Sequence, residues 1–250
     1  MTNKLSIETN NITPSRKDQI SEKLERQLRA FGCLLIKKVC LILELPHRTP
    51  ATAQVIFHKF YQMKSLKQIE VKIIALSSVF LSCKLEETPR RVRHIINTFV
   101  SIDQIEQKQK QVPINPLNQE YWEIKNEIIQ GESYILNQIG FDLQIEHPFK
   151  FLLNYSNTLK CSPKLIQKAW NFLNDCFMID VCIKYPSPLL AVSCLFISSE
   201  ILGETIFEKQ NLSNWKLFNT TIEDITKVSQ EILSLYKDPK PQYVDLSEEN

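Results

Sequence analysis

The chain has 250 residues, of which 43% are hydrophobic, 23% are charged and only 4 are glycine, and its formal net charge is +2. Phosphate-binding loops and tight β-turns need glycine, and neither G-x-G-x-x-G nor G-x-x-x-x-G-K-[ST] occurs, which excludes Rossmann and P-loop proteins and disfavours an all-β fold. The small net charge gives no electrostatic sign of nucleic-acid binding, so a mostly helical protein remains.

Prolines and polar clusters divide the first half of the chain into apolar segments with helical spacing. We predict helices over residues 20–45, from Pro50 in a favourable first-turn position, over 67–86, and from Thr88 to about residue 100. The third of these is apolar on nearly every side and rich in small residues, which is typical of a buried helix with closely packed neighbours.

Residues 101–118 lose this periodicity and contain two prolines, so we interpret them as a loop. Apolar residues from Leu117 to Ile139 resume the helical spacing, and Gly140 stands where a helix-ending glycine is expected. Residues 141–147 then form a predicted linker to the second half of the chain.

The second half of the chain repeats the first. Residues 73–84 (IIALSSVFLSCK) align without gaps on residues 189–200 (LLAVSCLFISSE), an offset of 116, and the last helices of the two halves match at an offset of 97. The difference between the offsets is about the length of the predicted 101–118 loop. This pattern indicates the duplication of a five-helix unit.

We therefore predict an all-α protein with two five-helix domains, each built around a buried third helix. The expected boundaries are 19–143 for the first domain and 144–237 for the second. The polar ends, residues 1–18 and 238–250, are expected to be disordered.

The chain carries no recognisable motif for catalysis or metal binding. Its four histidines are dispersed, its seven cysteines form no C-x-x-C pair, and neither H-E-x-x-H nor G-x-S-x-G occurs. We expect no metal, no cofactor, no small-molecule substrate and no catalytic site, and we expect reduced, buried cysteines. No apolar run approaches the length of a membrane span, so we expect no membrane partner.

Two charged residues stand at the edges of apolar helical faces. Lys84 ends the third predicted helix, and Glu132 lies between Ile128 and Ile135 on the fifth. Because burial of a lone charge is costly, each needs a partner. Two alternatives are open: the charges form an internal bridge or reach solvent, or they form a polar contact, framed by apolar residues, with another protein.

Three runs of sequence resemble the cyclin family. They are ATAQVIFHKFY, FLSCKLEETPRRVRHII and GESYILNQIGFDLQIEHPFKFLLNY, which occupy residues 51–61, 80–96 and 131–155 in the cyclin order. The K-[LVF]-E-E-x-P run and the FDL-x(2)-EHP run resemble the transcription-type cyclins K, L and T and the related cyclin Q. The resemblance covers about residues 25–237.

This resemblance implies a tandem cyclin-box protein that activates a cyclin-dependent kinase as its heterodimer partner, in the nucleus and in transcription. The chain itself is then no enzyme and binds no nucleic acid directly. In cyclins, the lysine and the glutamate at the positions of Lys84 and Glu132 grip the kinase. Further apolar residues are expected to frame that contact: Leu81, Leu85, Phe141 and Leu143.

The sequence departs from the cell-cycle cyclins in its first helix. Residues 28–32 (LRAFG) keep the Arg-Ala of the M-R-A-I-L patch that docks substrates there, but Gly32 replaces its last apolar residue and Leu35 replaces a tryptophan. Both changes argue against substrate docking at this patch.

Two other function classes remain as alternatives. One is a transcription factor similar to the two-repeat core of TFIIB, which should carry a zinc ribbon and a basic surface that this sequence does not show. The other is a helical adaptor that binds no kinase.

Overall fold

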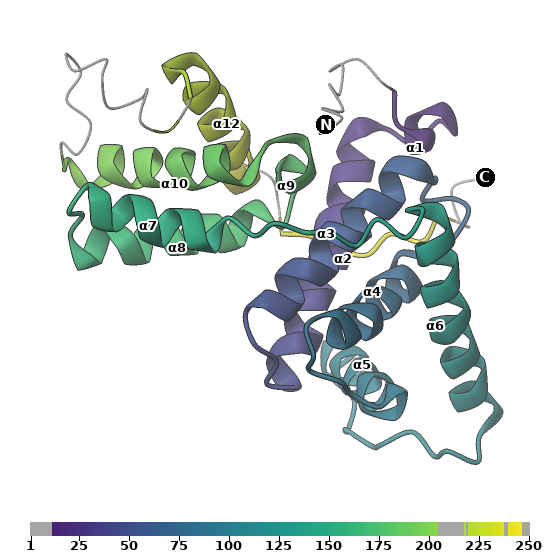
Figure 1. Ribbon diagram of the computed structural model, residues 1–250. Helices are drawn as coiled ribbons and strands as arrows, with labels where there is room; N and C mark the ends of the chain where they lie inside the picture. The colour runs from purple at the N-terminus through teal and green to yellow at the C-terminus, as the bar shows by residue number, and fades with distance from the viewer. Residues whose placement is uncertain (1–11, 205–217, 219, 238–239, 247–250) are drawn as a thin grey trace.

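The computed structural model describes residues 12–204, 218, 220–237 and 240–246, and every regular element within them is helical, as predicted. The helices form two groups joined by residues 139–148, which contain no helix (Figure 1). The first group comprises α1 (Pro14–Lys17), α2 (Glu22–Ile42), α3 (Arg48–Met63), α4 (Val71–Leu85), α5 (Val92–Glu106) and α6 (Gln119–Gln138). The second comprises α7 (Phe149–Thr158), α8 (Pro163–Cys176), α9 (Val181–Lys184), α10 (Ser187–Leu202), α12 (Ile222–Ser234) and the 3-10 turn η1 (Leu235–Lys237).

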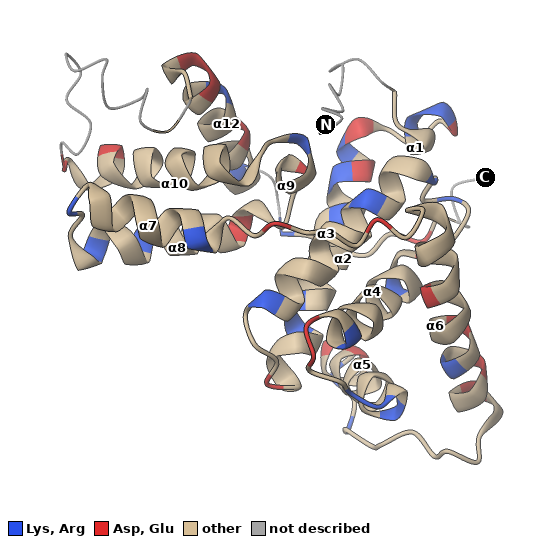
Figure 2. Cartoon of the chain, viewed as in Figure 1, with Lys and Arg blue, Asp and Glu red and all other residues tan. Residues whose placement is uncertain are grey.

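One apolar helix lies at the centre of each group. α4 packs against α2, α3 and α6, and α10 packs against α7, α8 and α12. Both central helices carry few charges (Figure 2) and bury small side chains such as Ser77 and Ser193 completely. The first residues of α4 and α10, Val71 and Ser187, are separated by the offset found in the sequence. The structure thereby confirms the repeat and its buried central helix.

Local signals set several helix ends. The hydroxyl oxygens of Ser21 and Ser162 accept hydrogen bonds from backbone N–H groups in the first turns of α2 and α8, at 3.3 and 3.2 Å. Gly140 and Gly203 follow α6 and α10 with φ of 62° and 67°, left-handed values that favour glycine. The predicted role of Gly140 at a helix end is confirmed.

The predicted start of α3 is wrong by two residues. The helix begins at Arg48 and includes Pro50 as its third residue. Proline is tolerated there because the first N–H groups of a helix have no intrahelical partner in any case.

The predicted limits of α5 and of the following loop are also wrong. α5 begins at Val92, four residues after Thr88, and continues through Glu106. Ile102 extends its apolar face and is 6% exposed, so burial overrides the polar residues around it. The segment without helix is limited to residues 107–118, and Leu117, which we counted in the next helix, is 88% exposed in front of α6.

The expected disorder of the chain ends is wrong for the part that the structure describes. α1 lies within residues 1–18, and the hydroxyl oxygen of its buried Ser15 accepts a hydrogen bond from the Leu66 N–H at 3.1 Å. Near the other end, Val244 and Leu246 pack against the core of the first group. Residues 1–11, 238–239 and 247–250 lie outside the described residues.

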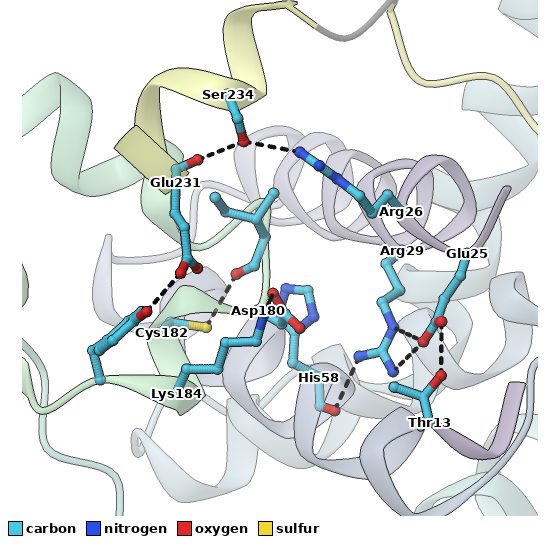
Figure 3. Close-up of polar contacts among 12 residues, drawn as sticks. Thr13, Glu25, Arg26, Arg29, His58, Asp180, Cys182, Lys184, Glu231 and Ser234 are labelled. Atoms are coloured by element: carbon cyan, nitrogen blue, oxygen red, sulfur yellow. Dashed lines mark hydrogen bonds and ion pairs between the residues drawn. The ribbon is translucent and has the colours of Figure 1, made fainter. Parts of the chain in front are cut away.

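Polar contacts join the two groups, and Figure 3 shows part of this junction. His58 Nε2 on α3 lies 3.1 Å from the carbonyl oxygen of Phe177. Arg26 on α2 donates to Ser234 Oγ on α12 at 2.9 Å (Figure 3). Burial lowers the pKa of His58 to about 4, so the neutral ring donates its Nε2–H to the carbonyl. Arg29 and Glu25, also visible in Figure 3, form a buried ion pair of 2.9 Å beside it.

Candidate functional site

Lys84 and Glu132 meet across the packed helices α4 and α6. Lys84 Nζ donates to both oxygens of the Glu132 carboxylate, at 2.7 and 2.8 Å. The two side chains differ in exposure, since 11% of the Glu132 side chain is exposed and 49% of the Lys84 side chain. The enclosed carboxylate and the Phe80 ring, whose centre lies 4.1 Å from Lys84 Nζ, therefore fix the end of a lysine side chain that is half exposed.

Gly131 explains how α6 approaches α4 so closely at this point. A Cβ atom at position 131 would lie only 2.3 Å from Ser77 Oγ on α4. Ser77 in turn donates its hydroxyl hydrogen to the carbonyl oxygen of Ile128, at 3.1 Å. A glycine inside a helix usually costs about 1 kcal/mol, but here it permits the close packing that brings the next residue, Glu132, to Lys84.

The apolar residues expected to frame this pair differ in their accessibility. Leu81 is 3% exposed and belongs to the core of the first group. Leu85 and Leu143 are half-buried at its margin. Phe141 is 63% exposed and has a φ of 57°, a left-handed value that is uncommon for an aromatic residue. Phe141 is thus the exposed aromatic residue at the end of the helix that carries Glu132.

A second polar network, which we did not predict, anchors the loop after Lys84. Thr52 on α3 donates its hydroxyl hydrogen to Glu86 Oε1 at 2.6 Å, and the same hydroxyl oxygen lies 2.8 Å from His147 Nε2. Because the hydroxyl hydrogen is used for Glu86, the histidine donates its Nε2–H. Burial lowers the pKa of His147, which favours this neutral form.

This network links the two sequence runs that carry the strongest family resemblance. Glu86 belongs to the KLEE run and His147 to the EHP run, and Thr52 lies between them on a third run, 51–61. The signal in the sequence was the co-occurrence of the runs. Their spatial contact spans 95 positions between Thr52 and His147 and could not be read from local patterns.

The described residues hold no group of three or more histidine, cysteine, aspartate or glutamate side chains that could bind a metal ion. The seven cysteines are free. None of the helices in the described part of the chain combines the length and apolar character needed to cross a membrane.

Two repeats of helices, packed around the apolar central helices α4 and α10, form a tandem cyclin-box architecture. The profile of the family "Cyclin, N-terminal domain" matches residues 2–144. Among curated proteins, the chain is 37% identical to cyclin-L1-1 of Oryza sativa subsp. japonica over 95% of its length, and 34% identical to human cyclin-L1 over the same share. The chain belongs to the cyclin family, and it resembles the L type among the transcription-type cyclins.

The chain spans about half the length of these curated relatives, 55% of the rice protein and 45% of the human one. Solved structures share its fold. A chain of the yeast RNA Pol II CTD kinase CTDK-1 complex matches with a TM-score of 0.72 and 20% identity, covering 89% of this chain and 70% of that chain. A chain of the yeast TFIIK complex matches with a TM-score of 0.55 and 21% identity, covering 88% of both chains.

Proposed function

We propose that this protein is the activating, non-catalytic subunit of a cyclin-dependent kinase that acts in transcription, in the nucleus. The observation that carries the proposal is the half-exposed Lys84 side chain, whose ammonium group is held by the enclosed Glu132 carboxylate at 2.7 Å. A charge that is both fixed and accessible is well suited to a partner's carboxylate or carbonyl groups, because little side-chain entropy is lost on binding. The cyclin-L relatives and the kinase complexes with the same fold support the same function.

In the proposed mechanism, the first repeat binds the regulatory helix of the kinase and displaces it inward. The glutamate of that helix then pairs with the catalytic lysine, and the activation loop opens. All chemistry stays in the kinase. On the cyclin side, Lys84, Leu85, Phe141 and Leu143 form the contact, while Glu132 holds Lys84 and Leu81 packs beneath it.

We further propose domain boundaries at residues 19–143 and 144–237, with the first domain as the kinase-binding unit. Two clusters of buried apolar residues support this division, one formed almost entirely by residues 20–135 and the other mainly by residues 149–232. Met178 belongs to the first cluster, and Ala51 and Val55 belong to the second, so the two domains are expected to fold as a unit.

Exchanging the two charges of the Lys84–Glu132 pair tests whether the pair only stabilises the fold or also binds the kinase. The double variant Lys84→Glu/Glu132→Lys keeps an ion pair between α4 and α6 but reverses the charge that faces a partner. We expect its melting temperature to stay within about 2 °C of the wild type, while kinase recovered by affinity purification from the native cell falls about 100-fold.

Two outcomes of this experiment would count against the proposal. If the double variant retains the kinase as the wild type does, the pair serves the internal bridge alone. If the wild-type chain retains no kinase and instead retains promoter DNA or other proteins, the alternatives of a TFIIB-like factor or an adaptor are favoured. Retained kinase should also be assayed on a peptide from the RNA polymerase II tail.

A further inference from the structure

The C-terminal segment returns from the second repeat to the first and lies against α2 and the start of α4. In Figure 1 this segment is the yellow stretch that lies beside the first helical group. The ring of Tyr243 lies 5.3 Å from that of Phe31 on α2, and Lys72 Nζ on α4 lies 4.1 Å from the centre of the Tyr243 ring. The Tyr243 hydroxyl donates to Glu70 Oε1 at 3.2 Å. Three neighbours from two elements thus hold one aromatic side chain.

The residues around Tyr243 continue this contact without regular secondary structure. Gln27 Nε2 on α2 donates to the carbonyl oxygen of Gln242 at 3.4 Å, a contact to the main chain. Val244 and Leu246 pack their side chains against the core of the first repeat, and the side chains of Gln242 and Asp245 are exposed. One aromatic and two aliphatic anchors with a main-chain hydrogen bond are the pattern of a bound linear peptide.

The groove that receives this segment extends beyond it. A cavity of about 290 Å³ adjoins Tyr243, which forms one of its walls. The apolar part of the lining comes from α2 and α5, and the cavity edge carries the Lys38–Glu106 ion pair. The apolar lining residues are Phe31, Leu34, Leu35, Phe99 and Ile102.

This groove includes the part of α2 for which the sequence argued against substrate docking. Arg29 is 5% exposed and engaged by Glu25, so it is unavailable to a partner. Gly32 serves internal packing, since a Cβ there would lie 2.3 Å from the Phe57 ring. Phe31 faces outward, and Tyr243 lies against it. The apolar surface of α2 is therefore not absent but already occupied.

We propose that this face of the first repeat is a peptide-docking groove that the chain fills with its own residues 242–246. The competing ligand is a linear peptide of the same chemistry, in which aliphatic residues stand one and three positions after an aromatic residue. Aromatic and cation–π contacts of the kind made by Tyr243 are individually weak. Tethering compensates for this weakness by raising the effective concentration of the segment, so an outside peptide binds only in the fraction of time that the groove is open.

The test uses a fluorescently labelled peptide that copies residues 240–246 (KPQYVDL), with fluorescence anisotropy as the readout. The 250-residue chain with Tyr243→Ala should bind it about tenfold more tightly than the wild type, because the internal competitor is weakened. The matched control is Gln242→Ala, which changes an exposed side chain and keeps the carbonyl that Gln27 contacts. It should bind the peptide as the wild type does.

Two further measurements localise the binding. A peptide with alanine in place of tyrosine should not bind the Tyr243→Ala protein, and Lys72→Ala in that background should weaken the binding of the original peptide about threefold. Leu246→Ala offers a second way to loosen the segment and should raise peptide affinity in the same direction. If the wild type, Tyr243→Ala and Leu246→Ala proteins bound the peptide with equal affinity, the proposal would be overturned. It would also be overturned if Lys72→Ala left the peptide affinity of the Tyr243→Ala protein unchanged. Both results are independent of kinase binding.

Discussion

The two repeats share one architecture but differ at the positions where the first carries its charged pair. At the offset of 116, Lys84 corresponds to Glu200, and at the offset of 97, Glu132 corresponds to Ser229. Glu200 is exposed at the end of α10. Ser229 is 5% exposed, and its hydroxyl has no hydrogen-bond partner within the described residues. The duplication thus preserved the buried central helix without preserving the ion pair.

An apolar hollow lies at the corresponding end of the second repeat. A cavity of about 440 Å³ is lined there by Phe172, Ile201, Leu233 and Tyr236, together with Lys168 and Asn171. Ile201 occupies the position that corresponds to Leu85 of the first repeat. The same fold thus carries two different sets of side chains at the ends of its central helices, and a difference in binding between the repeats is expected to arise from these side chains.

The largest effect is expected from removing the carboxylate that distinguishes the first repeat. Glu132→Ala frees the Lys84 ammonium from its fixed position and removes an enclosed charge on which the proposed kinase contact depends. We expect about a 100-fold loss of affinity for the kinase, or roughly 3 kcal/mol, measured with purified proteins by surface plasmon resonance. Ser229→Ala, at the corresponding position, should leave the affinity unchanged. Equal losses of kinase affinity in Glu132→Ala and Ser229→Ala would show that the Glu132 carboxylate does not distinguish the first repeat from the second.

The next effect concerns the close packing of α6 on α4. Gly131→Ala places a Cβ atom 2.3 Å from Ser77 Oγ, and we expect the free energy of unfolding to fall by about 1–3 kcal/mol in urea denaturation. The double variant Ser77→Gly/Gly131→Ala should lose less than the sum of the two single variants, because the steric conflict is gone. Additive losses would show that the approach of the two helices is not limited by this pair.

A smaller effect is expected from the junction between the repeats, where the pKa of His58 is lowered by burial to about 4 from an ordinary 6.5. The unfolded chain therefore binds more protons than the native protein between these values. The stability that the neutral ring contributes is complete above about pH 6.5 and is lost as the pH falls toward 4. Between pH 7 and pH 5.5 this loss is about 1 kcal/mol.

The measurement for this prediction is the pH dependence of the urea midpoint in wild type and His58→Gln. The variant should show a flatter dependence over that interval, since glutamine does not titrate. His94→Gln, at an exposed histidine on α5, is the control and should follow the wild type. If His94→Gln also flattened the pH dependence of the urea midpoint, the effect would not come from His58 at the junction.

Residues close in sequence made the central features of the fold predictable. Helical spacing of apolar residues and the gap-free alignment of the two central helices rest on local patterns, and both were confirmed. Lys84 and Glu132 stood out because each charge interrupts an apolar face. Their contact at 2.7 Å is now known, whereas their role in kinase binding stays a prediction.

Contacts between distant parts of the chain were beyond such patterns. Thr52 is an ordinary helical residue until folding brings Glu86 and His147 to its hydroxyl group. Tyr243 lies in a polar, proline-containing tail that composition alone marks as disordered, and it gains order from Phe31 and Lys72, both more than 170 positions away. Burial by tertiary packing, rather than local preference, decides both cases.

The smallest effect should come from a partly exposed ion pair between Lys37 and Asp175, which also links the two repeats. Lys37 on α2 lies 3.2 Å from Asp175 on α8, and the side chains are 31% and 34% exposed. Water screens such a pair, so Lys37→Met should lower the free energy of unfolding by less than about 1 kcal/mol in urea denaturation at low salt. The Asp175 carboxylate keeps the hydrogen bond that the Tyr236 hydroxyl donates to it at 2.8 Å, which limits the damage further. A loss as large as that of Gly131→Ala would mean that this partly exposed pair, and not the buried contacts of His58, holds the repeats together.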